Sequence, residues 1–134
     1  MQVPSLYLDT SVIGGYYDAV FLADTRALWR LKEAGRIAFF SSVIVEQEIA
    51  GAPERMQVLM RATFAGARLL PLSREADELG TAYLAQRVVP VDYEDDAYHI
   101  AICMVARLDY LVSWNFRRLA NVWRDRRAGC GVGG

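Results

Sequence analysis

The segment "SLYLDTSVIGG", from Ser5 to Gly15, decides the fold that we expect of this chain. It begins as a short apolar run, which is typical of a buried strand, and the run stops at the carboxylate of Asp9. Two hydroxyl residues and two glycines come next. The carboxylate has two interpretations: it caps a helix that follows the strand, or it belongs to a ligand site at the strand's end. This segment alone leaves both open.

Apolar runs and helical patterns alternate along the rest of the chain. The strands that we expect span residues 5–8, 37–40, 68–72 and 110–113. The helices that we expect span residues 24–34, 42 to about 51, 54–65, 73–87, 92–107 and 116–120. This alternation predicts an α/β fold in which helices cover both faces of a mostly parallel sheet. The strand at 68–72 is expected at or near an edge, because Pro71 has no N–H to donate.

The length and composition fit one domain. The chain has 134 residues, of which 54% are hydrophobic, and it shows no internal repeat or linker. We expect residues 1–123 to form this domain. The final stretch, "RDRRAGCGVGG" at residues 124–134, has few residues that could join a core, so we expect a disordered or truncated tail.

The compartment expected is the cytoplasm. Two cysteines, Cys103 and Cys130, do not make a disulfide framework, and Cys103 lies in an apolar helical stretch typical of a core. The sequence starts without the pattern of a signal peptide. No uninterrupted apolar run approaches the roughly 18 residues of a membrane-spanning helix, so we expect no membrane partner.

Charge is informative only in its distribution. The net charge of −1 gives no indication of a nucleic-acid partner. Six arginines and two aspartates lie between Arg107 and Arg127, however, and they make this end of the chain basic. A solvated helix face and a surface that steers an RNA backbone explain these arginines equally well.

Acidic and amide side chains gather where the predicted strands end. The candidates are Asp9 after the first strand, Glu46 and Glu48 after the second, Asp95 and Asp96 in the helix before the last strand, and Asn115 after that strand. In an open parallel sheet, ligands bind at the carboxyl ends of the strands. These residues, distant in sequence, are therefore expected to meet at one edge of the sheet.

Asp96 makes the strongest independent case for a ligand. If Asp92 is the N-cap of its helix, Asp95 falls where a capping box places a carboxylate, but Asp96 has no capping role. It precedes an apolar helix face, where a carboxylate is costly unless a cation compensates it. Clustered carboxylates without a histidine or cysteine ligand set favour a hard cation, Mg²⁺ or Mn²⁺.

Four motifs, "YLDTSVI", "SSVIVEQEI", "DDAYHIA" and "LVSWNFRRL", resemble in order and spacing the motifs of the PIN-domain family. The nearest relatives by this resemblance are the VapC-like toxins of type II toxin–antitoxin systems. The similarity extends over residues 5–121. It implies a three-layer α/β/α sandwich and a Mg²⁺- or Mn²⁺-dependent endoribonuclease that leaves 5′-phosphate and 3′-hydroxyl ends.

The resemblance also implies roles for individual residues. It assigns four catalytic positions, which are Asp9, Glu48, Asp96 and Asn115. The first three would hold the metal, with Glu48 preferred over Glu46 by its place in the motif. Asn115 stands where many members carry a fourth acid, so the site has one negative charge fewer. Ser11 and Ser113 match hydroxyl positions that support the site.

The partners are also implied by the resemblance. They are single-stranded or structured RNA, a cognate antitoxin protein and a second copy of the chain in a homodimer, with Arg117 and Arg118 as possible RNA contacts. The alternative that we keep is a catalytically inactive PIN-like module that binds RNA or a protein. A phosphatase that uses Asp9 as a nucleophile is a third hypothesis, but the only lysine, Lys32, lies early in the chain.

Overall fold

The computed structural model describes residues 2–87 and 94–115. Along the chain its elements are β1 (Ser5–Leu8), α1 (Thr10–Gly15), α2 (Leu22–Glu33), β2 (Ala38–Phe40), α3 (Val43–Ile49), α4 (Glu54–Thr63), α5 (Arg74–Ala85), α6 (Glu94–Val105) and β3 (Tyr110–Val112). The three strands form a parallel sheet in the order β2-β1-β3, with Leu6 of β1 opposite Phe39 on one side and Tyr110 on the other. The predicted α/β class and parallel sheet are confirmed.

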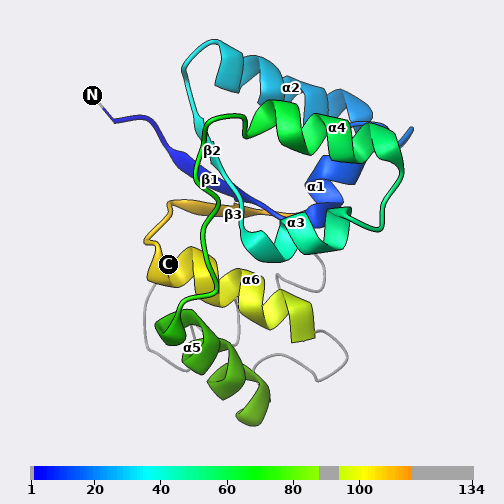
Figure 1. Cartoon of the computed structure of the whole chain (residues 1–134). Coiled ribbons are helices and arrows are strands. Elements are labelled where there is room, and N and C mark those ends of the chain that lie inside the picture. Colours follow the sequence, from blue (N-terminus) through cyan, green and yellow to red (C-terminus); the bar gives the residue numbers. More distant parts are fainter. Residues whose placement is uncertain (1, 88–93, 116–134) are drawn as a thin grey trace.

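The helices lie on both sides of this sheet. Figure 1 shows α2 and α4 on one side of the strands and α5 and α6 on the other. This arrangement is compatible with three layers. Strand β1 lies in the middle, and Tyr7 and Leu8 are fully buried there. The residue that follows them, Asp9, is therefore carried to the carboxyl end of the central strand.

One expected strand did not form. Residues 68–72 are not a strand, and Leu70 makes only an isolated parallel bridge with Ser42. The Leu70 N–H donates to the Ser41 carbonyl at 3.0 Å, and the Leu70 carbonyl accepts from the Val43 N–H at 3.0 Å. The bridge does not extend into a ladder, because the partner segment turns into α3 at Val43, directly after Ser42. The predicted strand was wrong.

Helix starts agree with the sequence where a side chain caps the helix. Ser42 accepts from the Val45 N–H at the start of α3, and Ser73 accepts from the Ala76 N–H at the start of α5. Helix α2 begins at Leu22, before the expected start, and Phe21 at its N-cap position provides no side-chain bond. The expected cap Asp92, the helix at 116–120, and the tail from 124 lie outside the described residues.

Helices α5 and α6 pack closely against each other. A Cβ on Gly80 would lie 2.4 Å from Cδ1 of Tyr98, so only glycine permits this approach. Helix α6 buries its Ala97, Ile100 and Cys103 side chains against the sheet side of the core. Burial raises the pKa of the Cys103 thiol to about 12, which agrees with its predicted place in the core. Within the described residues, none of the helices is long and apolar enough to cross a membrane.

Candidate active site

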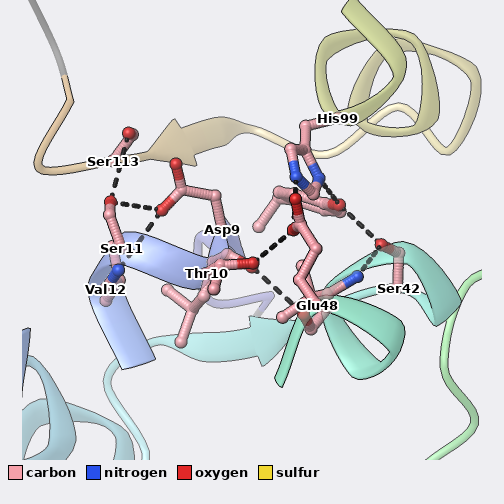
Figure 2. Close-up of polar contacts among 12 residues, drawn as sticks. Asp9, Thr10, Ser11, Val12, Ser42, Glu48, His99 and Ser113 are labelled. Atoms are coloured by element: carbon pink, nitrogen blue, oxygen red, sulfur yellow. Dashed lines mark hydrogen bonds and ion pairs between the residues drawn. The ribbon is translucent and has the colours of Figure 1, made fainter. Parts of the chain in front are cut away.

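Asp9 lies at the carboxyl end of β1 and begins α1. Its Oδ1 accepts the Val12 N–H at 3.2 Å, so the carboxylate caps the helix as one interpretation of the sequence predicted. The same oxygen accepts the Ser11 hydroxyl at 2.6 Å (Figure 2). The residue is only 3% exposed. Burial raises the pKa of this carboxyl, and the hydrogen bonds from Ser11 and Ser113 offset only part of that rise.

The loop after β3 completes the surroundings of Asp9. Ser113 lies 3.4 Å from Ser11, hydroxyl to hydroxyl, and the Trp114 N–H donates to the Ser11 hydroxyl at 2.9 Å. The Asn115 N–H donates to the Ser113 hydroxyl at 3.0 Å, and Asn115 itself is exposed. The structure therefore brings both predicted supporting serines to Asp9, while the Asn115 residue of the same loop is exposed to solvent.

Trp114 holds this loop against α1 and α2. Its ring stacks on Phe21, with centroids 5.5 Å apart, and its indole N–H donates to the Thr25 hydroxyl at 2.9 Å. A Cβ on Gly15 would lie 2.5 Å from the indole nitrogen, so this packing requires glycine there. The sequence offered no periodicity or spacing that would have joined Gly15 and Thr25 to Trp114.

Glu48 approaches from α3 on the other side of the site. One oxygen, Oε1, accepts both the Thr10 hydroxyl and the His99 ring nitrogen Nε2, the latter at 3.1 Å (Figure 2). Burial alone would raise the pKa of this carboxyl, but the hydrogen bonds from His99 and Thr10 outweigh it and hold the pKa at about 2. Glu46, the other candidate on this helix, is exposed and lines a groove with Ile49 and Met60 instead.

Helix α6 brings Asp95 to the Glu48 side and buries Asp96 in its first turn. Asp96 is only 5% exposed and lies one helical turn before His99, on the same face of the helix. Asp95 interacts with the Glu48 carboxyl, and burial together with that neighbour raises the Asp95 pKa. The sequence assigned Asp95 to capping and missed this contact, because only the folded chain places α3 beside the start of α6.

His99 links the Glu48 side to the core. The ring is 3% exposed, and Nδ1 lies 2.7 Å from the Tyr7 hydroxyl, which lies 2.7 Å from the Ser42 hydroxyl. Both ring nitrogens therefore have partners within the protein. The observed contacts favour a structural histidine over a catalytic base at this position. Neither Tyr7 nor Ser42 was predicted as its partner.

The chemistry of these donors fits a hard divalent cation. Asp9, Glu48 and Asp96 offer carboxylate oxygens from the end of β1, from α3 and from α6, and a cation would offset the burial that raises the Asp9 pKa. In residues 2–87 and 94–115, no three histidine, cysteine or acidic side chains are grouped as a ready-made metal site. Arg117 and Arg118 lie outside the described residues.

Comparisons with protein-family models, with curated proteins and with solved structures found no match to this chain. The function of the site has to be inferred from the residues that form it.

Proposed function

We propose that the chain is a Mg²⁺- or Mn²⁺-dependent endoribonuclease with a PIN-like three-layer domain. The observation that supports this most is Asp9. It is a buried carboxylate at the carboxyl end of the central parallel strand, held by the Ser11 hydroxyl and the Val12 N–H, and burial raises its pKa despite these contacts. Burying a carboxylate in this way costs free energy that a bound metal ion would offset.

Each acid has a separate task in this proposal. Asp9, Glu48 and Asp96 would hold the ion, which would stabilise negative charge on the reacting phosphate and make a bound water more acidic. Ser11 and Ser113 fix the orientation of the Asp9 carboxylate. The low pKa of Glu48 keeps that carboxylate ionised at neutral pH, so it remains available as an oxygen ligand.

RNA as the substrate rests on the resemblance of the four motifs to the PIN-domain family. The same resemblance is the reason to propose a toxin that is paired with an antitoxin protein and forms a homodimer in the cytoplasm. The exposed Asn115, at the open side of the loop after β3, supplies an amide that could contact substrate or orient a water.

The test is cleavage of a fluorophore–quencher single-stranded RNA by the purified chain in Mg²⁺ or Mn²⁺. We expect EDTA to abolish cleavage, and Asp96→Asn and Glu48→Gln each to reduce it by roughly hundredfold or more. Glu46→Gln is the matched control, because Glu46 lies on the same helix but is exposed away from the site. Cleavage that survives EDTA, or that Asp96→Asn leaves unchanged, would contradict the proposal.

The alternative function is an inactive PIN-like module that binds RNA or a protein. The observation in its favour is that the described acids are not grouped as a ready-made metal site. RNA binding that persists in EDTA, together with no cleavage in either metal, would support this alternative over the nuclease.

A further inference from the structure

We propose that His99 is a positioning residue that fixes the Glu48 carboxylate, and that Tyr7 and Ser42 in turn hold its ring. The inference rests on the proposed function, because its purpose is to hold a carboxylate for a metal ion. It assigns a role to the only histidine of the chain, which the proposed chemistry otherwise does not use.

The contact geometry shows which ring nitrogen of His99 donates to Glu48. A carboxylate can only accept hydrogen bonds, so Nε2 of His99, 3.1 Å from Glu48 Oε1, has to carry a proton and donate it. The Thr10 hydroxyl donates to the same oxygen. With two donors on Oε1, rotation of the carboxylate is restricted, and the neighbouring Asp95 interacts with the same carboxyl group.

The far side of the ring is held as firmly. Nδ1 lies 2.7 Å from the hydroxyl of Tyr7, a residue that is fully buried in the central strand. That hydroxyl lies 2.7 Å from Ser42 Oγ, which also accepts the Val45 N–H as the N-cap of α3. Each of these hydrogen-bonded oxygens and nitrogens has a partner in the buried part of the protein, so the His99 ring has little freedom to turn.

The elements that these residues join are the ones that carry the acids. Tyr7 lies on β1, two residues before Asp9, and Ser42 caps α3, which carries Glu48. His99 lies on α6, one turn after Asp96. A single chain of hydrogen bonds through Tyr7, Ser42 and His99 thus fixes the relative positions of all three acid-bearing elements.

Two other roles fit the contacts less well. A general base needs a ring nitrogen that reaches substrate or water, but both nitrogens of His99 face protein partners and the residue is 3% exposed. A histidine that only fills the core would not need a proton on Nε2 directed at the Glu48 carboxylate. If His99 only fills the core, polar replacements of similar size should affect metal binding and cleavage equally. The positioning role instead predicts that a replacement that keeps the bond to Glu48 differs from one that loses it.

The test compares His99→Gln with His99→Asn. The amide of glutamine can donate from about the position of Nε2 and so can keep the bond to Glu48, whereas the shorter asparagine amide lies near the position of Nδ1 and reaches only Tyr7. Both variants put a neutral amide into the same buried place. The measurements are Mn²⁺ affinity by calorimetry, RNA cleavage, and the side-chain nitrogen spectrum of ¹⁵N-histidine-labelled protein freed of any histidine tag.

We expect His99→Asn to weaken Mn²⁺ binding and cleavage by about tenfold or more, and His99→Gln to retain most of both. In the labelled protein, Glu48→Gln should shift the Nε2 resonance of His99 more than the Nδ1 resonance. Equal losses in the two His99 variants at equal thermal stability would overturn the inference, as would an Nε2 resonance that Glu48→Gln leaves in place.

The two proposals fail in different ways. If the unaltered protein neither binds Mn²⁺ nor cleaves RNA, the proposed function is wrong, and the nitrogen spectrum still decides whether His99 donates to Glu48. If the protein binds Mn²⁺ and cleaves, and His99→Asn matches His99→Gln, only the positioning role is wrong. Tyr7→Phe adds a check, because it removes the Tyr7 hydroxyl from Nδ1 and keeps the ring in the core.

Discussion

The two sides of the site hold their carboxylates in opposite ways. On one side, Asp9 is buried among Ser11, Ser113 and the start of α1, and burial raises its pKa. On the other side, Glu48 lies against His99 and Thr10, and its pKa falls to about 2. The same functional group is thus destabilised as an anion on the first side and stabilised on the second.

The difference lies in the partners. At Asp9, burial outweighs the hydroxyls, the Val12 N–H and the influence of His99, whereas Glu48 accepts hydrogen bonds directly from His99 and Thr10. In the proposed site, a bound cation would therefore gain most from Asp9, while the Glu48 carboxylate is already held in place by its hydrogen bonds.

The largest effect is expected from Asp9→Asn. Asparagine can still accept the Ser11 hydroxyl and the Val12 N–H, so α1 keeps its cap while the charge is lost. RNA cleavage should fall by about hundredfold or more, and the protein without metal should be as stable as the original or more stable. Cleavage assays and thermal unfolding in EDTA check the two parts. Full activity in this variant would remove Asp9 from the site.

A second large effect, on both stability and cleavage, is expected from Gly15→Ala, at the position where Trp114 packs the loop after β3 against α1. In Gly15→Ala the new Cβ would lie 2.5 Å from the Trp114 indole nitrogen and 2.8 Å from the Thr25 hydroxyl. We expect a loss of about 1–3 kcal/mol in the free energy of unfolding, and weaker cleavage because the same loop carries Ser113.

Gly14→Ala is the matched control for that prediction. Its Cβ would lie 3.2 Å from Cε of Met56, the flexible end of a side chain that can give way. Chemical denaturation should show a change within about 1 kcal/mol, because alanine also favours the helix. Equal losses in both variants would mean that Trp114 does not fix this loop.

The pH dependence of stability without metal separates the two sides by sign. A folded-state pKa of Asp9 above its ordinary 3.8 favours the protonated form, so its contribution is present at low pH and is lost as pH rises through the folded pKa. For Glu48, a folded pKa of about 2 against an ordinary 4.5 gives stability that is present above 4.5 and is lost as pH falls toward 2.

Denaturation in EDTA across pH measures both contributions. Asp9→Asn should reduce the loss of stability on going from acidic to neutral pH, and Glu48→Gln should reduce the loss on going from neutral to acidic pH. The account is contradicted if the two variants change the profile in the same direction.

The smallest effect is expected from Thr10→Val, which removes one of the two donors to Glu48 Oε1 and keeps a similar shape. Because His99 still donates, cleavage should fall by only a few-fold. Thr10→Ser, which keeps the hydroxyl, should restore it. A loss as large as that of His99→Asn would contradict this ranking and show that Thr10 holds the carboxylate as firmly as His99 does.

The features that the sequence predicted are those that short segments determine. The helices expected to start near residues 42 and 73 and the buried run Ser5–Leu8 follow from neighbours within a few residues, and each was found. The expected strand at 68–72 failed because pairing depends on a distant partner, and that partner turns into α3 directly after the bridge at Ser42.

For the site, the sequence placed the two serines near Asp9 correctly but did not predict the partners of Glu48 and His99. Ser11 and Ser113 were placed by motif and do lie at Asp9, yet Tyr7, Ser42 and Asp95 were not connected with Glu48 or His99. These contacts join residues from β1, α3 and α6, and only the packing of the three elements creates them. The sequence pattern of one helix or strand does not show which residues of another element it will contact.

The most direct test of the comparison is a Mn²⁺ titration followed by thermal unfolding of the original protein, Asp9→Asn and Glu46→Gln. A ligand that binds only the folded state stabilises it by RT ln(1 + [L]/Kd), so the melting temperature rises with the logarithm of the ligand concentration once that concentration exceeds Kd. We predict a rise for the original protein and for Glu46→Gln, and none for Asp9→Asn. Equal rises in all three, or no rise in the original protein, would contradict the claim that Asp9 holds a metal ion.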